Sequence, residues 1–463
     1  MKNLSASKLY ALAFGLFLGL CIWKFGNPVI LDRIIPSPVT PAQFLSEPWP
    51  THWAKWCLLP LAAVGGLLVG GGAKKIWPSR WLWLLPLVWL GWQILSATQS
   101  VDARLTVATL WQFAGCVACY FVGAFILSQA GLWRWLLPGV LAAFVFCLVR
   151  SVEQHVYEFP QNHQMLMEGE HCGWTNFLPE AVAAMKSERI IITTNGVDVA
   201  NPVILDKFAS GRVSGTLVYP NALAGIVLLL WPLSLVLAFE WFQGMKPIVR
   251  FPAMGLLVFL GSAGFYWSGS KLGWLIGIGL LGLFLLRFNW SKKLKCCSVM
   301  LVLVFGLGVF GLRFHHYFAA GATSASARID YWRAAVQTTV ANPMFGSGPG
   351  TFQRSYARIK APDAEMARLT HNDYLEQFSD SGVVGGLTYA GWILAALTTV
   401  RKKNWRTDEK LAVAILLGLL GWFAQGLGEF GLYIPALSWM AFTLLGGLVG
   451  QNINQIDKIT RNR

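Results

Sequence analysis

Residues 217–240 read LVYPNALAGIVLLLWPLSLVLAFE, and their only charged side chain is Glu240 at the very end. The hydrocarbon core of a bilayer is about 30 Å thick, and an α-helix crosses it with roughly 20 apolar residues. This stretch is therefore long and apolar enough to form a membrane-spanning helix. Eleven further runs of the same kind lie at 7–24, 54–72, 81–98, 106–128, 133–150, 251–268, 272–289, 297–313, 383–400, 411–429 and 434–451. The sequence thus predicts an all-α polytopic membrane protein with about 12 transmembrane helices.

The composition of the whole chain supports a membrane location. Of the 463 residues, 55% are hydrophobic and only 13% are charged, whereas soluble domains carry about 25% charged residues. These values exclude a disordered chain, a coiled coil and an ordinary cytosolic enzyme. The 37 Lys and Arg exceed the 22 Asp and Glu, which gives a formal charge of +15. In a membrane protein this excess indicates basic cytoplasmic loops and contact with anionic lipid or phosphate, so we expect no nucleic-acid partner.

The distribution of basic residues predicts the orientation of the chain. If the N-terminus is cytoplasmic, the inward segments hold 20 Lys and Arg and the short outward segments hold five. Cytoplasmic loops of membrane proteins carry the excess of basic residues. We therefore expect both termini to be cytoplasmic and the two long loops, 151–216 and 314–382, to face outward.

The two long loops separate three groups of helices. Residues 1–150 hold the first five helices, 217–313 hold helices six to nine, and 383–463 hold the last three helices and a cytoplasmic tail. These loops contain nearly all the polar residues of the chain that could take part in a reaction. In the first loop we expect a helix near 178–188 and a strand near 189–194.

The second loop has clear start and stop signals. A helix is expected near 323–341, because Asn342-Pro343 ends it. The glycines of GSGPG at 346–350 predict a turn that needs positive φ, and the loop lacks the GK[ST] of a phosphate-binding P-loop. Another helix should start near residue 371, with Thr370 as its cap.

The cysteines and histidines do not form a metal motif. Cys116 and Cys119 have CxxC spacing, but no second pair accompanies them, so we expect apolar packing. His315 and His316 are adjacent and would point to different faces of a helix, which favours an interfacial location. We expect no metal and no cofactor.

Four polar residues stand out beside the apolar runs. Arg212 lies in GRVSGTLVYPNALAG, Lys271 in the short connection SGSK, Arg328 in SARIDYWRAA and His371 in LTHNDYLEQF. Each of the three cations could simply be an interfacial residue whose side chain reaches the lipid head groups. His371 could equally be a helix-start residue that forms only local hydrogen bonds.

The segments that contain these four residues also resemble a known family. RVSGTLVYPNALAG, SGSKLGW, ARIDYWRAAVQTTVANPMFGSGPGTF and THNDYLEQFSDSGVVGG resemble, in this order, the signatures of the O-antigen ligase and O-antigen polymerase superfamily. The resemblance covers roughly residues 100–450. It implies a metal-independent glycosyltransferase of the bacterial inner membrane that uses a glycan carried on undecaprenyl diphosphate. The two long loops would then be periplasmic.

The resemblance also implies roles for individual residues. His371 of the HN motif is the expected general base, and Arg212 is an expected ligand of the diphosphate. Lys271 stands where the family usually has Arg, and Arg328 matches a recurrent family Arg. A neutral imidazole can take the proton of an attacking hydroxyl, and fixed cations stabilise the charge of a leaving diphosphate.

Three neighbours of His371 complete the set that the resemblance suggests. Asn372 and Tyr374 share the HN motif, and we expect them to bind substrate. Asp380 stands where the family often has Glu. Besides the donor, the expected partners are membrane lipids and an acceptor that is lipid A core or a glycan.

Other functions remain open on the sequence alone. A ligase would use lipid A core as acceptor, a polymerase would use another lipid-linked repeat, and a protein O-oligosaccharyltransferase would use Ser or Thr. The 66 residues of the first loop, without an added protein-binding domain, favour the first two. The different class is a polysaccharide or lipid transporter. Transporters place ionisable residues at the membrane midplane, whereas here the polar residues gather in the outward loops. A scaffold without activity is a third class.

Overall fold

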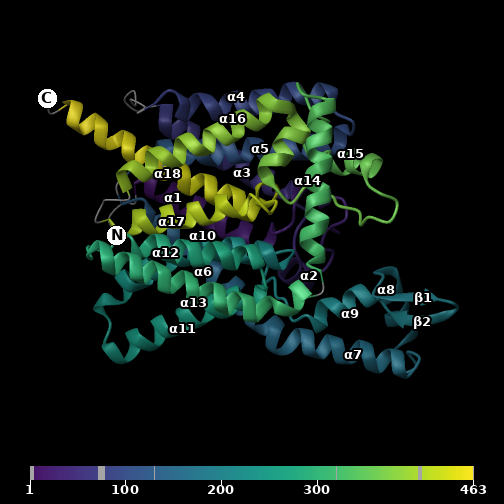
Figure 1. The fold of residues 1–463 in the computed structure, drawn as a ribbon. Coiled ribbons are helices and arrows are strands. Elements are labelled where there is room, and N and C mark those ends of the chain that lie inside the picture. Colours follow the sequence, from purple (N-terminus) through teal and green to yellow (C-terminus); the bar gives the residue numbers. More distant parts are fainter. Residues whose placement is uncertain (1–4, 71–78, 130, 320, 405–408, 462–463) are drawn as a thin grey trace.

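The computed structural model describes residues 5–70, 79–129, 131–319, 321–404 and 409–461, and most of them are helical (Figure 1). Each of the twelve predicted apolar runs overlaps one helix. These helices are α1 (Ala6–Lys24), α3 (His52–Gly70), α4 (Trp81–Ser96), α5 (Ala103–Val122), α6 (Trp133–Glu153), α10 (Pro220–Trp241), α11 (Pro247–Ser268), α12 (Lys271–Leu285), α13 (Lys292–Ala319), α16 (Asp373–Asn404), α17 (Lys410–Gln425) and α18 (Pro435–Arg461). The all-α polytopic fold is therefore confirmed.

The number of membrane spans depends on the length of each helix. Within the described residues, nine helical segments are long and apolar enough to cross a membrane. The helices α12 and α17 have only 15 and 16 residues, and at 1.5 Å per residue they cover about 22–24 Å. The exact count of 12 spans stays a prediction.

Shorter elements fill the connections between these helices. The first long loop contains α7, α8, α9 and a two-stranded antiparallel hairpin of β1 and β2, in which Ile191 pairs with Ala200. The second contains α14 and α15. The bounds are α2 (Pro41–Ser46), α7 (Phe159–His171), α8 (Pro179–Ser187), β1 (Ile191–Thr194), β2 (Val197–Ala200), α9 (Pro202–Ala209), α14 (Thr323–Ala341) and α15 (Phe352–Ile359), with short 3₁₀ or π segments at Val29–Leu31, Ala97–Gln99, Gly123–Leu127, Gln154–Glu158, Phe242–Gly244 and Gly431–Tyr433.

The start of the first loop differs from the expectation. The apolar run ends at residue 150, but the helix does not: α6 continues through a π segment, Gln154–Glu158, directly into α7. Polar residues follow residue 150, and they continue the helix instead of starting a coil. The first outward segment thus begins as a helical extension.

The core of the bundle is built around α18. Its residues 435–450 are all buried, as expected for a helix that is apolar on every side. Small residues permit close packing at this helix: a Cβ on Gly446 would clash with the Tyr120 carbonyl oxygen. Such contacts replace the hydrophobic effect as a source of helix association in lipid.

The two ends of the chain and the two long loops lie at opposite ends of the bundle. In Figure 1 both ends of the chain are on the left, whereas α7, α8, α9, α14 and α15 are on the right. This arrangement is compatible with termini on one side of a membrane and both loops on the other. Five of the basic residues counted for orientation lie outside the described residues: Lys2, Lys74, Lys75, Arg406 and Arg463.

Native cysteines offer a test of orientation. Cys172 is exposed after α7, and Cys296 is exposed near the start of α13. In intact cells, a variant with Cys172 as its sole cysteine should react with a membrane-impermeant thiol reagent. A variant with only Cys296 should react only after permeabilisation. Lys186→Cys and Lys360→Cys in a cysteine-free chain should behave like the Cys172 variant, and reactivity of either site only from the cytoplasm contradicts the topology.

Candidate functional site

A buried carboxylate, Glu429, lies where both long loops meet the bundle. It follows α17, and its exposed fraction is 3%. Its Oε1 accepts hydrogen bonds from Arg328 Nη2 at 2.5 Å and from Asn221 Nδ2 at 2.7 Å. Its Oε2 accepts a hydrogen bond from the Tyr219 hydroxyl at 2.8 Å and lies 3.4 Å from His371 Nδ1. One carboxylate therefore joins four side chains from three separate segments of the chain.

Glu429 remains ionised despite its burial. Burial raises the pKa of this carboxyl group, but the hydrogen bond to His371, the charge of Arg328 and the hydrogen bond from Tyr219 outweigh burial and lower the pKa below its ordinary value. The site thus contains a fixed negative charge next to an imidazole.

His371 presents one free ring nitrogen to the site. Its ring packs near Tyr331, at 6.0 Å between centroids, and against the edge of Phe430 at 4.8 Å. The side chain is 27% exposed. A proton on Nδ1 can be donated to Glu429, which leaves the lone pair on Nε2. Nε2 has no hydrogen-bond partner among the described residues, so it is available to accept a proton.

Arg212 is held at the edge of the same site. Its Nε donates to the Ser268 carbonyl oxygen at 3.0 Å, and its Nη2 donates to Asn221 Oδ1 at 3.0 Å. Asn221 thereby bridges Arg212 and Glu429. Gly269 has a φ of +58°, and a Cβ there would lie 3.0 Å from the Arg212 Nε. Glycine in SGSK therefore permits both the turn and the close approach of the guanidinium.

Lys271 comes from the first turn of α12, directly after this glycine turn. Its Nζ lies 3.8 Å from the centroid of the Tyr317 ring and 5.4 Å from that of Phe314. Arg212, Arg328 and Arg313 all repel its charge. Within the described part of the chain, no salt bridge pairs Lys271 with a carboxylate. Aromatic faces hold this cation in place without neutralising it.

The charges at this site do not balance. Arg212 and Arg328 both interact with one carboxylate, Glu429, and Lys271 lies close enough to both arginines to be repelled by them. Burial lowers the pKa of the Arg212 guanidinium, Glu429 opposes this shift, and Arg328 adds to it; the group nevertheless stays protonated, as arginine does in proteins. Like charges brought together favour a bound anion. The arrangement can bind an anion with several charged oxygens beside the free nitrogen of His371.

Asn372 and Tyr374 are turned toward the protein. Asn372 Oδ1 accepts from the backbone N–H groups of residues 374 and 375, and its Nδ2 donates to the Leu427 carbonyl oxygen at 2.8 Å. The Tyr374 hydroxyl donates to the Phe423 carbonyl oxygen at 3.1 Å. These bonds fix the start of α16 to the end of α17. The structure does not bring these two polar groups together with the three cations.

The predicted cap of this helix is wrong by two positions. Asn372, not Thr370, caps α16, because its side chain accepts the first free N–H groups. The Thr370 hydroxyl accepts instead from the Asn372 N–H, and its single proton lies within reach of the Asn372 carbonyl oxygen and of Glu376 Oε2. Between them, His371 adopts a φ of +51°, which is uncommon for a residue other than glycine. The two neighbours therefore hold His371 in a left-handed conformation.

The GSGPG turn holds α16 from the other side. Gly346, Gly348 and Gly350 all have positive φ, as predicted. The Gly350 N–H donates to Asp380 Oδ2 at 2.7 Å. At Gly382, where α16 is kinked, a Cβ would clash with the Met344 carbonyl oxygen. The turn therefore packs tightly against α16, which carries the HN motif, and Asp380 attaches the turn to this helix by a hydrogen bond.

The cysteines and the histidine pair discussed from the sequence lie outside this site. Within the described ranges, no group of three or more His, Cys, Asp or Glu could hold a metal ion. Cys116 and Cys119 are buried free thiols in α5. His315 and His316 lie near the end of α13, with ring centroids 3.7 Å apart.

Sequence reasoning missed the centre of the site. Glu429 stands out in the sequence only as a charge at the end of an apolar run, and Asn221 and Tyr219 were not singled out. The available signals were a carboxylate beside a predicted span and a polar Asn directly after the proline that begins α10.

Part of the chain is similar to a known family. Residues 256–390 match the family model of the O-antigen ligases, which confirms the resemblance seen in the motifs. The match includes Lys271, Arg328 and His371, whereas Arg212 and Glu429 lie outside it. No curated protein matches the chain. The match supports an activity of the O-antigen ligase and polymerase type, which acts on lipid-linked glycans.

Proposed function

We propose that this chain transfers a glycan from undecaprenyl diphosphate to an acceptor hydroxyl at the periplasmic face of the bacterial inner membrane. The favoured acceptor is the lipid A core. The observation that carries the proposal is the free Nε2 of His371 beside three converging cations. A base for a hydroxyl and a binding site for a diphosphate are the two requirements of this reaction.

The cations bind the donor through its diphosphate. Arg212 has donors beyond the two that its neighbours use, and Lys271 has no acidic partner within the described residues. Arg328 is attached to Glu429 through one nitrogen only, as far as the described contacts extend. A diphosphate offers enough oxygens to satisfy all three groups, and it relieves their mutual repulsion.

His371 activates the acceptor. Its Nε2 takes the proton of the acceptor hydroxyl while the oxygen forms a bond to the anomeric carbon of the donor sugar. The bond between this carbon and the diphosphate oxygen breaks, and its electron pair leaves with undecaprenyl diphosphate. Glu429 stabilises the imidazolium that forms, and the cations stabilise the leaving group. No metal enters this scheme, so transfer should persist in a chelator.

The distribution of charge favours this enzyme over a transporter. The ionisable side chains of the site lie at one end of the bundle, at the starts of α12 and α16 and in the connection after α17. A transporter would need them near the middle of the helices. Glycan profiling of a deletion strain tests the acceptor: loss of long chains from the lipid indicates a ligase, shortened chains a polymerase, and unglycosylated protein a protein transferase.

Variants at Lys271 test the diphosphate site. Lys271→Ala should weaken donor binding about tenfold or more, because a charge-assisted contact to phosphate is lost. Lys271→Arg should retain binding and turnover, since a guanidinium suits the same anion. Donor affinity can be measured with a fluorescent analogue of the donor lipid in detergent micelles.

The matched control is Arg104→Ala, which removes an exposed cation from the first turn of α5, at another outward helix end. It should bind donor like the wild type. Normal donor affinity in Lys271→Ala, or an equal loss in Arg104→Ala, speaks against a specific diphosphate site.

A further inference from the structure

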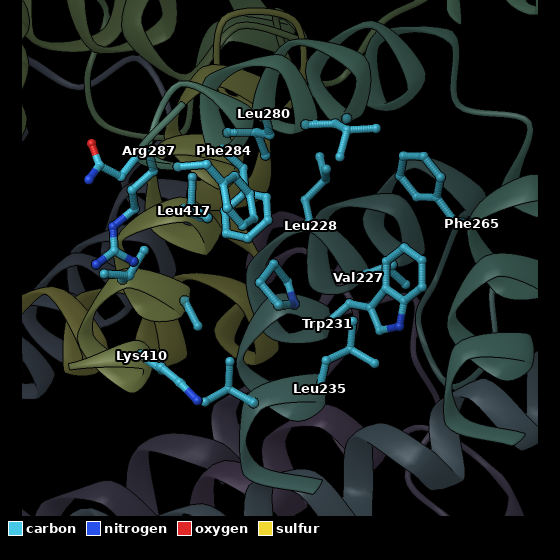
Figure 2. A pocket seen from close by; sticks show the side chains of 18 residues that line it. Val227, Leu228, Trp231, Leu235, Phe265, Leu280, Phe284, Arg287, Lys410 and Leu417 are labelled. Carbon is cyan, nitrogen blue, oxygen red and sulfur yellow. The ribbon is translucent and has the colours of Figure 1, made fainter. Parts of the chain in front are cut away.

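A polar cavity lies between α14, α15, the GSGPG turn and the connection from α4 to α5, at the end of the bundle where Figure 1 shows α14 and α15. Its volume is about 450 Å³, within the range of small-molecule sites. Half of its 14 lining residues have polar side chains. A second cavity, between α10, α12 and α17, is instead lined mainly by apolar side chains such as Leu228, Phe284 and Leu417 (Figure 2). The polar cavity therefore suits a ligand with several hydrogen-bonding groups.

Five polar side chains of the lining are available to bind a ligand. None of them forms a hydrogen bond or an ion pair within the described part of the chain: they are Gln99, Gln337, Asn342, Ser355 and Arg358. The amides and the hydroxyl can each donate and accept hydrogen bonds, and the guanidinium adds further donors. A ligand rich in hydroxyl groups matches this set, because each hydroxyl also donates and accepts.

Backbone hydrogen bonds fix the floor of this cavity. The Ser347 N–H donates to the Ser379 carbonyl oxygen at 3.1 Å, and the Ser347 carbonyl oxygen accepts from the Val101 N–H at 3.0 Å. The Val383 N–H donates to the Pro343 carbonyl oxygen at 2.8 Å. These bonds attach the turn to α16 on one side and to the connection before α5 on the other. A cavity with a fixed floor loses little conformational freedom when a ligand binds.

Apolar side chains lie among the polar ones. Phe345 belongs to the lining, and its ring stacks on that of Trp92 with 5.4 Å between the centroids. Met344 and Ile359, also in the lining, are 54% and 40% exposed. A sugar ring combines hydroxyl groups at its edge with C–H groups on its faces, so it fits a lining of this mixed kind. An extended peptide would pair with the edge of a sheet, and no described strand borders the cavity.

The polar cavity shares α14 with the candidate site but is remote from it. Arg328, which contacts Glu429, lies in the first half of α14, whereas Gln337 and Asn342 lie 9 and 14 residues after it. At 1.5 Å per residue, these two residues are about 14 and 21 Å from Arg328 along the helix axis. A ligand in the cavity therefore lies away from the groups that react. Under the topology expected from the basic residues, the cavity and the site face the same side of the membrane.

We propose that this cavity binds a stretch of saccharide several sugar units away from the bond that the proposed reaction makes. The proposal rests on the proposed function for the source of the saccharide, which is the glycan of the donor or the lipid A core of the acceptor. The amides and Arg358 bind the hydroxyl groups, and Phe345 contacts the C–H face of a sugar ring. Contacts at this second place add to those at the reacting end, so a longer glycan binds more tightly than a short one.

Binding of released oligosaccharides to the purified full chain tests the proposal. One probe is the oligosaccharide of the lipid-linked glycan, and the other is that of the lipid A core, both freed from lipid by mild acid. We expect saturable binding in isothermal titration calorimetry, and the tighter probe identifies the source of the saccharide. The double variant Gln337→Ala with Arg358→Ala should weaken this binding about tenfold or more. Ser355→Trp, which fills the cavity without removing a charge, should weaken it as well.

The matched control is Arg333→Ala with Gln353→Ala, which changes the same residue types on the same two helices outside the lining. It should bind the probe like the wild type. The proposal is overturned if neither probe binds the wild type saturably, if the variant at Gln337 and Arg358 keeps full affinity, or if glycerol competes as well as the oligosaccharide does. His371→Asn should keep the affinity for the probe while transfer is lost, so a failure of the cavity and a failure of the proposed reaction give different results.

Discussion

His371→Asn should lower the turnover number of glycan transfer by about 10²–10⁴-fold, the usual contribution of a general base. Asparagine is chosen because it tolerates positive φ, and residue 371 has a φ of +51°. The backbone at the start of α16 should therefore be preserved while the base is lost. Donor affinity should change much less than turnover, because no cation is removed. Single-turnover kinetics with the purified protein measure the two separately.

The control for this variant is His171→Ala, which removes an exposed imidazole at the end of α7. It should transfer glycan at the wild-type rate. If correctly inserted His371→Asn protein also transfers at nearly that rate, then His371 is not the base. His371→Ala should agree with His371→Asn, although its backbone is less well suited to positive φ.

Glu429→Gln should also lower turnover by about 10²–10⁴-fold, but for a different reason. The amide oxygen of the new side chain can still accept from Arg328 and Asn221, which places the amide N–H₂ opposite His371 Nδ1. The amide donates to Nδ1, so the imidazole carries its proton on Nε2 and cannot act as a base there. Donor binding should not weaken, since one negative charge has left the site.

A loss of turnover without a loss of donor affinity in Glu429→Gln distinguishes a role in positioning His371 from a purely structural role. A protein that merely unfolds locally would lose both. Tyr219→Phe is the matched control, because it removes another hydrogen bond to Glu429 but keeps the carboxylate. It should show a much smaller loss of turnover. A wild-type turnover number in Glu429→Gln would contradict the role of Glu429 in holding the proton of His371 on Nδ1.

The sequence predicts the helices well where local signals are strong. The helix α14 spans Thr323–Ala341 as expected, because Asn342-Pro343 cannot continue it. The end of α6 could not be predicted in this way, because the end of an apolar run marks the end of the hydrocarbon layer and not the end of a helix. Thr370 and Asn372 are both good caps, and only the positive φ of His371 selects Asn372.

The candidate site was predictable only in part. Arg212, Lys271, Arg328 and His371 were identified through family motifs, and each motif is local in the sequence. The role of Glu429 depends on contacts with residues 58 to 210 positions away. Such contacts exist only once the helices are packed, so no local pattern indicates them. The same holds for the bonds of Asn372 and Tyr374 to the end of α17.

The most direct test of the central claim is a stoichiometric transfer assay. The purified chain is reconstituted in liposomes with a glycan on undecaprenyl diphosphate and with lipid A core, both accessible on the same face. We expect one undecaprenyl diphosphate to be released for each glycan joined to the acceptor, with this release nearly abolished in His371→Asn. Movement of intact donor lipid across the bilayer without release of undecaprenyl diphosphate would contradict the account, because it is the result expected of a transporter.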